Sequence, residues 1–335
     1  MLVLLNFGIQ FHKSQFNMFG QGLVFGGIAG GGVETLIHFL TVAGGGGQGN
    51  GRAGIIGGGG GGGFRTSYGT SGANSPAEPQ PTFIGGTTYT ITVGAGGADT
   101  AGYMDGRGNG GVSSIVGGDV NISSLGGGYA GYINYYYNQG PQVGGSGAGA
   151  GYSGVNSATG ASAGTSNQGM AGRVTDSSNG KLASGGGGGA FQAGTPANTS
   201  TNVESKGGQG GTTTIVSTTN AVSSLAGEVS GGTLYFAGGG QGVMSSTAHG
   251  NLGGSTGGGL GGGGDYGLHG TANTGGGAGP TACDSWCYGR NGGSGAVILR
   301  IPSEDYSGVV TGAPDVYTEG SDKVLVYTGS GSYTH

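Results

Sequence analysis

The chain has 335 residues, of which 94 are glycine and only 7% are charged, and its formal net charge is −5. An ordinary globular protein has about 7% glycine and about 25% charged residues, so this composition argues against an enzyme built around one deep hydrophobic core. The small number of Lys and Arg residues, none of them clustered, also excludes the basic surface that a nucleic-acid-binding protein needs.

The first segment, residues 1–32, is rich in phenylalanine. Met1–Phe7 is apolar, but it lacks a basic n-region and a cleavage site of small residues, and it is too short to cross a bilayer. We therefore expect neither a secretory signal nor a membrane span. Two interpretations of the segment remain open: an arm that is buried against a partner chain, or the first strands of the domain. The five phenylalanines are Phe7, Phe11, Phe16, Phe19 and Phe25.

Runs rich in β-branched and aromatic residues, each next to a glycine block, predict short β-strands from Val33 onward. The strongest run is Gly295–Pro302, which ends at a proline. No segment of helical length has apolar residues at helical spacing, so almost no α-helix is expected. The other predicted strands are Val33–Ala43, Thr87–Val93, Val112–Val116, Gly211–Ser217 and Thr233–Ala237.

The glycine blocks, such as Gly57–Gly63 and Gly185–Gly189, do not have glycine at every third position and are accompanied by only 8 prolines. These features exclude a collagen triple helix. The blocks are either flexible tethers or polyproline-II-like helices that pack side by side through backbone hydrogen bonds, which only glycine permits at such close approach. Composition alone leaves both alternatives open.

Several of these segments together resemble the glycine-rich domain of bacteriophage tail-fibre and other virion proteins. Leu36–Gly47 is similar to its opening strand and glycine block, Thr90–Gly97 to its internal strand, and Gly292–Pro302 to its closing strand. Asp322–Thr334 is similar to the strand pair that often flanks the domain. The resemblance favours packed glycine helices. It implies an all-β, sandwich-like framework of short strands, with long glycine-rich insertions packed as polyglycine II helices and almost no α-helix.

We expect three regions on this basis. Residues 1–32 form an attachment or oligomerisation arm, residues 33–302 the glycine-rich domain, and residues 303–335 a C-terminal β-strand segment.

The sequence offers no catalytic constellation. Matches to G-x-G-x-x-G arise from the glycine blocks and lack the following helix that a dinucleotide site requires. Cys283 and Cys287 are the only cysteines, and two ligands do not complete a structural zinc site; a short disulfide or two free thiols are the expected states. The five histidines are scattered, and Glu304 and Asp305 precede a turn. We expect no enzyme activity, no cofactor and no metal.

Two aromatic clusters are candidates for receptor binding. Tyrosine and asparagine together form adaptable contact surfaces, and aromatic faces suit sugar rings. The alternative is that these side chains cover the ends of glycine segments that have no side chains of their own. The candidate residues are Tyr129, Tyr132, Tyr135, Tyr136, Tyr137, Trp286 and Tyr288.

The resemblance implies a tail-fibre or fibre-tip adhesin of the virion, assembled in the host cytoplasm as a homotrimer. Its expected partners are other tail or virion proteins and a host-surface glycan or outer-membrane protein. One alternative is a virion component without a receptor, such as a capsid decoration or tail connector protein. A secreted ice-binding or cell-wall protein is a further alternative, against which the missing signal peptide argues.

Overall fold

The structure is a computed structural model of the chain. All the residues that it describes belong to the unit Gly32–His335. They are residues 32–49, 54–99, 108–130, 132–133, 138–153, 160–174, 182–198, 200, 203–245, 259–265, 267–280, 282–283 and 288–335.

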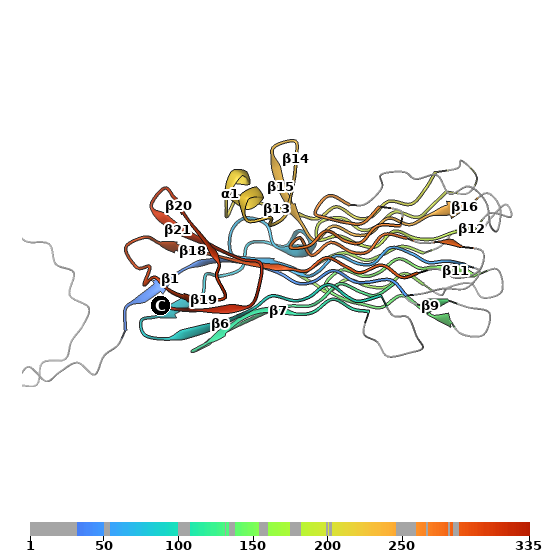
Figure 1. The fold of residues 1–335 in the computed structure, drawn as a ribbon. Helices are drawn as coiled ribbons and strands as arrows, with labels where there is room; N and C mark the ends of the chain where they lie inside the picture. The colour runs from blue at the N-terminus through green and yellow to red at the C-terminus, as the bar shows by residue number, and fades with distance from the viewer. Residues whose placement is uncertain are drawn as a thin grey trace, which may run out of the picture. The chain divides into compact units, whose positions relative to one another are not determined.

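Two five-stranded antiparallel sheets form a sandwich, as the sequence predicts (Figure 1). The central sheet has the order β20-β21-β18-β2-β4, with β20 Asp315–Glu319, β21 Asp322–Tyr327, β18 Ala296–Pro302, β2 His38–Val42 and β4 Phe64–Thr66. The outer sheet has the order β19-β22-β6-β7-β8, with β19 Val309–Thr311, β22 Gly331–Thr334, β6 Thr88–Thr92, β7 Ser113–Gly117 and β8 Val120–Ser124.

The core of the sandwich lies between these two sheets. Successive residues of a strand point to opposite faces, so Val297, Leu299 and Ile301 of β18 face the outer sheet. Aromatic rings fill much of this layer, and the rings of Phe83 and Tyr89 stack with their centroids 3.6 Å apart. β1 (Glu34–Leu36) and β5 (Thr82–Ile84) form a separate two-stranded sheet beside the sandwich.

A third layer covers the other face of the central sheet. It consists of the sheet β13-β15-β14 and the short helix α1, which pack on Ala296 and Ile298 of β18. Because β18 is covered on both faces, nearly its whole length is apolar, which explains why it is the strongest strand signal in the sequence. The bounds are β13 Gly211–Thr213, α1 Thr218–Ser223, β14 Glu228–Ser230 and β15 Thr233–Phe236.

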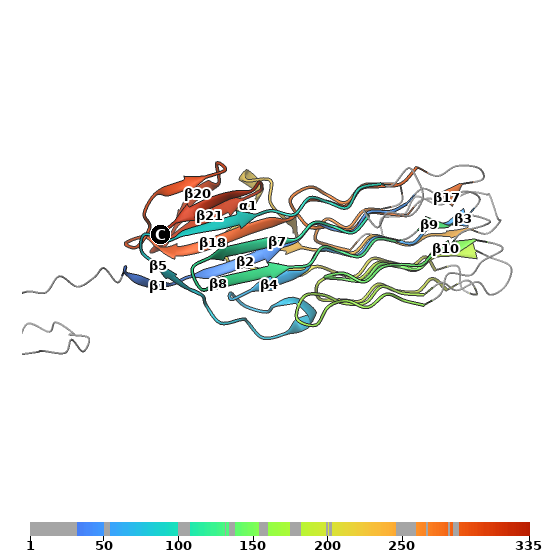
Figure 2. The ribbon, with the colours of Figure 1, turned by 90° about the horizontal axis from the view of Figure 1, so that it is seen from below.

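Extended glycine-rich segments run side by side from the sandwich as one bundle (Figures 1 and 2). The segment 43–48 shows how they are joined. Its residues donate their amides to three neighbouring segments in turn, and every third residue returns to the same neighbour, which is the period of a polyproline-II-type helix. Ala43 and Gly46 donate to Gly63 and Gly60, respectively. In the same order, Gly44 and Gly47 donate to Gly111 and Gly108, and Gly45 and Gln48 donate to Gly293 and Arg290.

The interior segment Gly57–Gly63 is hydrogen-bonded to six surrounding segments, three through its amides and three through its carbonyl oxygens. A Cβ atom added at any position from Gly57 to Gly62 would overlap a carbonyl oxygen of another segment. The described glycine blocks are therefore packed helices and not tethers, and glycine is required because no space remains for a side chain.

Peripheral segments follow a related rule. In the segment 203–210, Ser205 and Gly208 are buried, whereas Val203, Lys206 and Gln209 are exposed. The three-residue period thus separates an inner row that must be small from an outer row that can carry side chains.

At the end of the bundle away from the sandwich, here called the bundle tip, the chain forms strands of two residues each (Figures 1 and 2). They pair as β11-β3-β17, β10-β9 and β12-β16. Their bounds are β3 Gly54–Ile55, β9 Tyr132–Ile133, β10 Asn138–Gln139, β11 Tyr152–Ser153, β12 Leu182–Ala183, β16 Met244–Ser245 and β17 Ala282–Cys283.

Two strand predictions need correction. The run Val33–Ala43 divides at Ile37, because β1 pairs with β5 whereas β2 pairs with β18. The run Gly211–Ser217 is a strand only to Thr213, because Ser217 caps α1 by accepting a hydrogen bond from the Asn220 amide. In the described part of the chain no helix has the length and apolarity to cross a bilayer.

Candidate functional site

The bundle tip contains the start of the predicted tyrosine cluster. Tyr132 opens β9, where it pairs with Gln139 of β10. Tyr135, Tyr136 and Tyr137 lie outside the described residues, in the four-residue connection between these two strands. Trp286 also lies outside the described residues, shortly after β17.

Tyr129 is a buried member of the candidate set, with 2% of its surface exposed. Its ring occupies the space beside Gly108 that a side chain would need there, and its amide donates to Asn109 Oδ1 at 2.8 Å. This placement matches the alternative in which aromatic side chains cover glycine segments.

Tyr288 is 76% exposed and follows β17 in the chain. The neighbouring Arg290 binds backbone carbonyl oxygens, with Nε 2.5 Å from Gly267 O and Nη1 3.1 Å from Gly289 O. Leu268, next to Gly267, is also exposed. Arg290 thus joins the segment that carries the exposed Tyr288 to the segment that carries the exposed Leu268.

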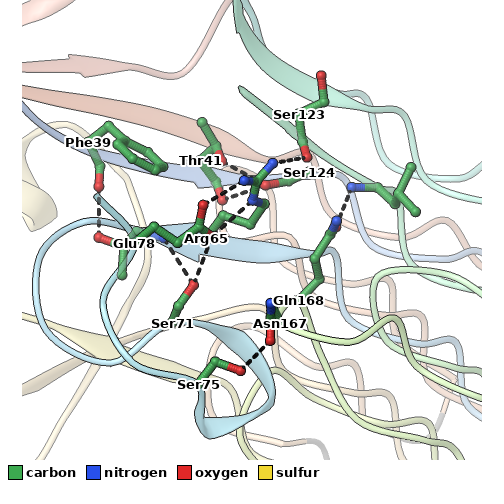
Figure 3. Close-up of polar contacts among 12 residues, drawn as sticks. Phe39, Thr41, Arg65, Ser71, Ser75, Glu78, Ser123, Ser124, Asn167 and Gln168 are labelled. Carbon is green, nitrogen blue, oxygen red and sulfur yellow. Dashed lines mark hydrogen bonds and ion pairs between the residues drawn. The ribbon is translucent and has the colours of Figure 1, made fainter. Parts of the chain in front are cut away.

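A polar cluster joins the sandwich to the bundle (Figure 3). We call it the junction cluster and define it as Arg65, Ser71, Glu78, Ser123 and Gln168. Arg65 forms a two-pronged ion pair with Glu78, with distances of 2.9 Å from Nε and 2.5 Å from Nη2. Its third nitrogen, Nη1, donates to the carbonyl oxygen of Ser123 at 2.9 Å, which links β4 to the end of β8.

Gln168 extends the junction cluster into the glycine bundle. Its side-chain Oε1 accepts from the amide of Leu125 at 2.7 Å, and its backbone carbonyl accepts from the amide of Phe64 at 3.0 Å. The cluster therefore fixes three chain segments at the boundary between strand pairing and glycine packing. Arg65, Ser71 and Glu78 are bonded to one another and Gln168 is bonded to backbone amides, so the arrangement is that of a structural joint.

A second ion-pair group lies at the end of the central sheet where β20 turns into β21. Arg300 Nε binds Asp322 at 2.7 Å and Nη1 approaches Glu319 at 3.4 Å. Burial alone would raise the pKa of Glu319, but hydrogen bonds from the Ser217 amide and from Asn220, together with the charge of Arg300, outweigh burial and lower it. Within the described ranges no group of three or more His, Cys, Asp or Glu residues is placed to hold a metal ion.

With this geometry established, the comparisons place the chain in a family. A family model described as a glycine-rich domain matches residues 26–302. The chain belongs to this glycine-rich domain family. The match ends at the last residue of β18, and the strands β19 to β22 that follow complete the two sheets of this glycine-rich domain protein. No curated protein and no solved structure matches the chain significantly.

Sequence reasoning did not identify the junction cluster. Arg65 and Glu78 are 13 residues apart, Gln168 lies far from both in the chain, and the three belong to no motif. The sequence held one signal for this cluster. Only 7% of the residues are charged, and an Arg that becomes partly buried is usually paired, so each Arg could have been examined as a candidate for an ion pair.

Proposed function

We propose that this glycine-rich domain protein is a bacteriophage virion component, a tail-fibre or fibre-tip adhesin that attaches the particle to its host. The observation that carries the proposal is the gathering of the short strand pairs at the bundle tip, away from the sandwich. Binding residues are commonly carried by connections that a rigid scaffold holds in place.

The glycine bundle supplies a scaffold of this kind. Each interior segment is hydrogen-bonded in several directions around its axis, so bending it would break bonds on every side. Such a support keeps its tip at a fixed distance from its base without a large hydrophobic core.

In this proposal the tip binds a host-surface glycan or an outer-membrane protein. The proposed contacts are Tyr132, Tyr135, Tyr136, Tyr137, Trp286 and Tyr288. Residues 1–32 attach the protein to other virion proteins, and the assembled form is a homotrimer. The proposed role in the virion is one of binding and support, without catalysis.

Adsorption measurements test the proposal. Replacing Tyr135, Tyr136 and Tyr137 with Ser should reduce adsorption of particles to host cells at least tenfold while the particles still assemble. The control is Val222→Ser, at an exposed position of α1 beside the sandwich, which should leave adsorption unchanged. Normal adsorption of particles that lack the protein would refute the adhesin role and favour a decoration or connector protein.

A further inference from the structure

A groove opens on the side of the sandwich, apart from the bundle tip. Its cavity volume is about 490 Å³, within the range of about 300–1,000 Å³ that small-molecule sites occupy. Its walls come from β13, from the start of β15, from the start of α1 and from the segment that follows β4. We call it the threonine groove.

Hydroxyl groups dominate its lining. Each of these hydroxyls both donates and accepts hydrogen bonds. Within the described part of the chain, the hydroxyls of Thr70, Thr212, Thr214, Thr218 and Thr233 have no protein partner, which leaves them available to a ligand. The hydroxyl-bearing residues of the lining are Tyr68, Thr70, Thr212, Thr213, Thr214, Ser217, Thr218 and Thr233.

The Tyr68 ring is held in a fixed orientation at one wall. The His38 ring meets it edge-on at a centroid distance of 4.8 Å, and the Arg300 guanidinium lies 5.5 Å from its centroid. A ligand therefore meets a preoriented aromatic side chain, which reduces the entropy lost on binding.

The charges around the groove disfavour an anion. The cation beside the Tyr68 ring, Arg300, is 16% exposed and is bound to Asp322, Glu319 and the Ile215 carbonyl oxygen. The lining carboxylate of Glu319 already accepts from the Ser217 amide and from Asn220. Neither group is free to bind an ionic ligand, so recognition must come from hydroxyls, threonine methyl groups and the Tyr68 ring.

We propose that the threonine groove binds a neutral carbohydrate of one or two sugar rings. A sugar offers hydroxyls that match those of the lining and C–H faces that pack on methyl groups and on an aromatic ring. The site is distinct from the bundle tip, and this proposal does not depend on the phage assignment.

The test uses the full chain and a panel of neutral mono- and disaccharides, with sialyllactose as an anionic comparison, in saturation-transfer NMR followed by titration. We expect at least one neutral sugar to bind and the anionic sugar not to compete with it. The double variant Thr212→Val and Thr233→Val, which keeps the shape and removes two hydroxyls, should weaken binding at least tenfold. The double variant with Ser at both positions should retain it.

Two controls make the result decisive. Thr92→Val changes an exposed threonine of β6 away from the groove and should leave sugar binding unchanged. Replacing Tyr135, Tyr136 and Tyr137 with Ser should also leave it unchanged. Absence of a signal from every neutral sugar at millimolar concentration would overturn the proposal. Equal binding by the Val variant would also overturn it, and so would a preference for an extended peptide paired with the edge of β13.

Discussion

Gly61 donates its backbone amide to the carbonyl oxygen of Gly188 at 2.9 Å, although the two residues belong to distant segments of the chain. Bonds of this type replace side-chain packing in the bundle. The close approach of the backbones in the interior leaves no room for a Cβ atom at positions such as Gly61. Interior glycine positions should therefore be as sensitive to substitution as the core residues of an ordinary protein.

The variant Gly61→Ala tests this expectation. Its Cβ would overlap the carbonyl oxygen of Ala237, and because the obstacle is backbone it cannot rotate away. We expect the free energy of unfolding to fall by about 3 kcal/mol, at the upper end of typical overpacking costs, with faster amide exchange in Gly57–Gly63. The control Gly329→Ala adds the same methyl group where no atom lies within 4 Å, and it should unfold at the wild-type temperature. Equal melting temperatures for the two variants would contradict the packed-helix interpretation.

The outer row of the segment 203–210 leads to a second prediction. Val203, Lys206 and Gln209 carry side chains where an additional glycine helix would otherwise dock, much as charged residues block pairing at the edge of a β-sheet. Replacing all three with Gly should promote self-association, measured by sedimentation velocity at increasing protein concentration. The matched triple Ala variant keeps the blocking Cβ atoms and should sediment like the wild-type protein. Identical sedimentation of the Gly and Ala variants would show that these side chains do not control association.

The junction cluster gives a third prediction. Arg65→Lys keeps the charge but loses the geometry that binds Glu78 through two nitrogens and Ser123 through a third. Hydrogen bonds to charged groups contribute about 1.5–3 kcal/mol each, so we expect a loss of about 2 kcal/mol in thermal unfolding experiments. Lys323, whose amine binds the exposed Thr318 hydroxyl, provides the control, and Lys323→Met should change stability by less than about 0.5 kcal/mol. A loss no larger than that of the control would mean that the cluster does not strengthen the joint.

Acid should destabilise the protein through two groups. Burial lowers the pKa of His38; the Ser67 hydrogen bond and Asp322 oppose this effect, whereas the charge of Arg300 adds to it. The unfolded chain therefore takes up a proton at His38 near the ordinary pKa of 6.5, before the folded protein does. The contribution of neutral His38 to the free energy of unfolding is fully present above pH 6.5. It is lost as the pH falls towards the lowered pKa of His38 in the folded protein. Glu319, whose folded pKa is also lowered, adds a second loss below its ordinary value of 4.5.

Unfolding measured at pH 7.5, 6 and 5 checks the first of these effects. The variant His38→Gln has no proton to gain, so its stability should fall less than that of the wild-type protein over this range. Equal losses of stability in the two proteins would show that His38 does not contribute to the destabilisation by acid.

The sequence predicted the strands well where side chains carry the information. β6, β15 and β18 follow from runs of β-branched and aromatic residues, and β18 stands out because both of its faces are covered. The arrangement of the bundle could not be predicted in the same way. Gly58 and Gly59 are chemically identical, yet one bonds to Gly185 and the other to Ala278, so neighbours are chosen by the fold as a whole.

The candidate site could likewise be predicted from the sequence only in part. Tyr132 opens β9 at the tip and Tyr288 is exposed, and a role of these residues in binding stays a prediction. The burial of Tyr129 could not be foreseen, because its cause is the packing of its ring beside a glycine far away in sequence.

The pairing of β2 with β18 has a consequence for biosynthesis. β2 is translated long before β18, and β21, which pairs with the other edge of β18, is translated later still. The central sheet therefore cannot form on the ribosome until the glycine-rich segments between β2 and β18 have been synthesised, and contacts between segments so distant in sequence form slowly. Until then β2 is exposed without β18, and unpaired strand edges of this kind are prone to aggregation.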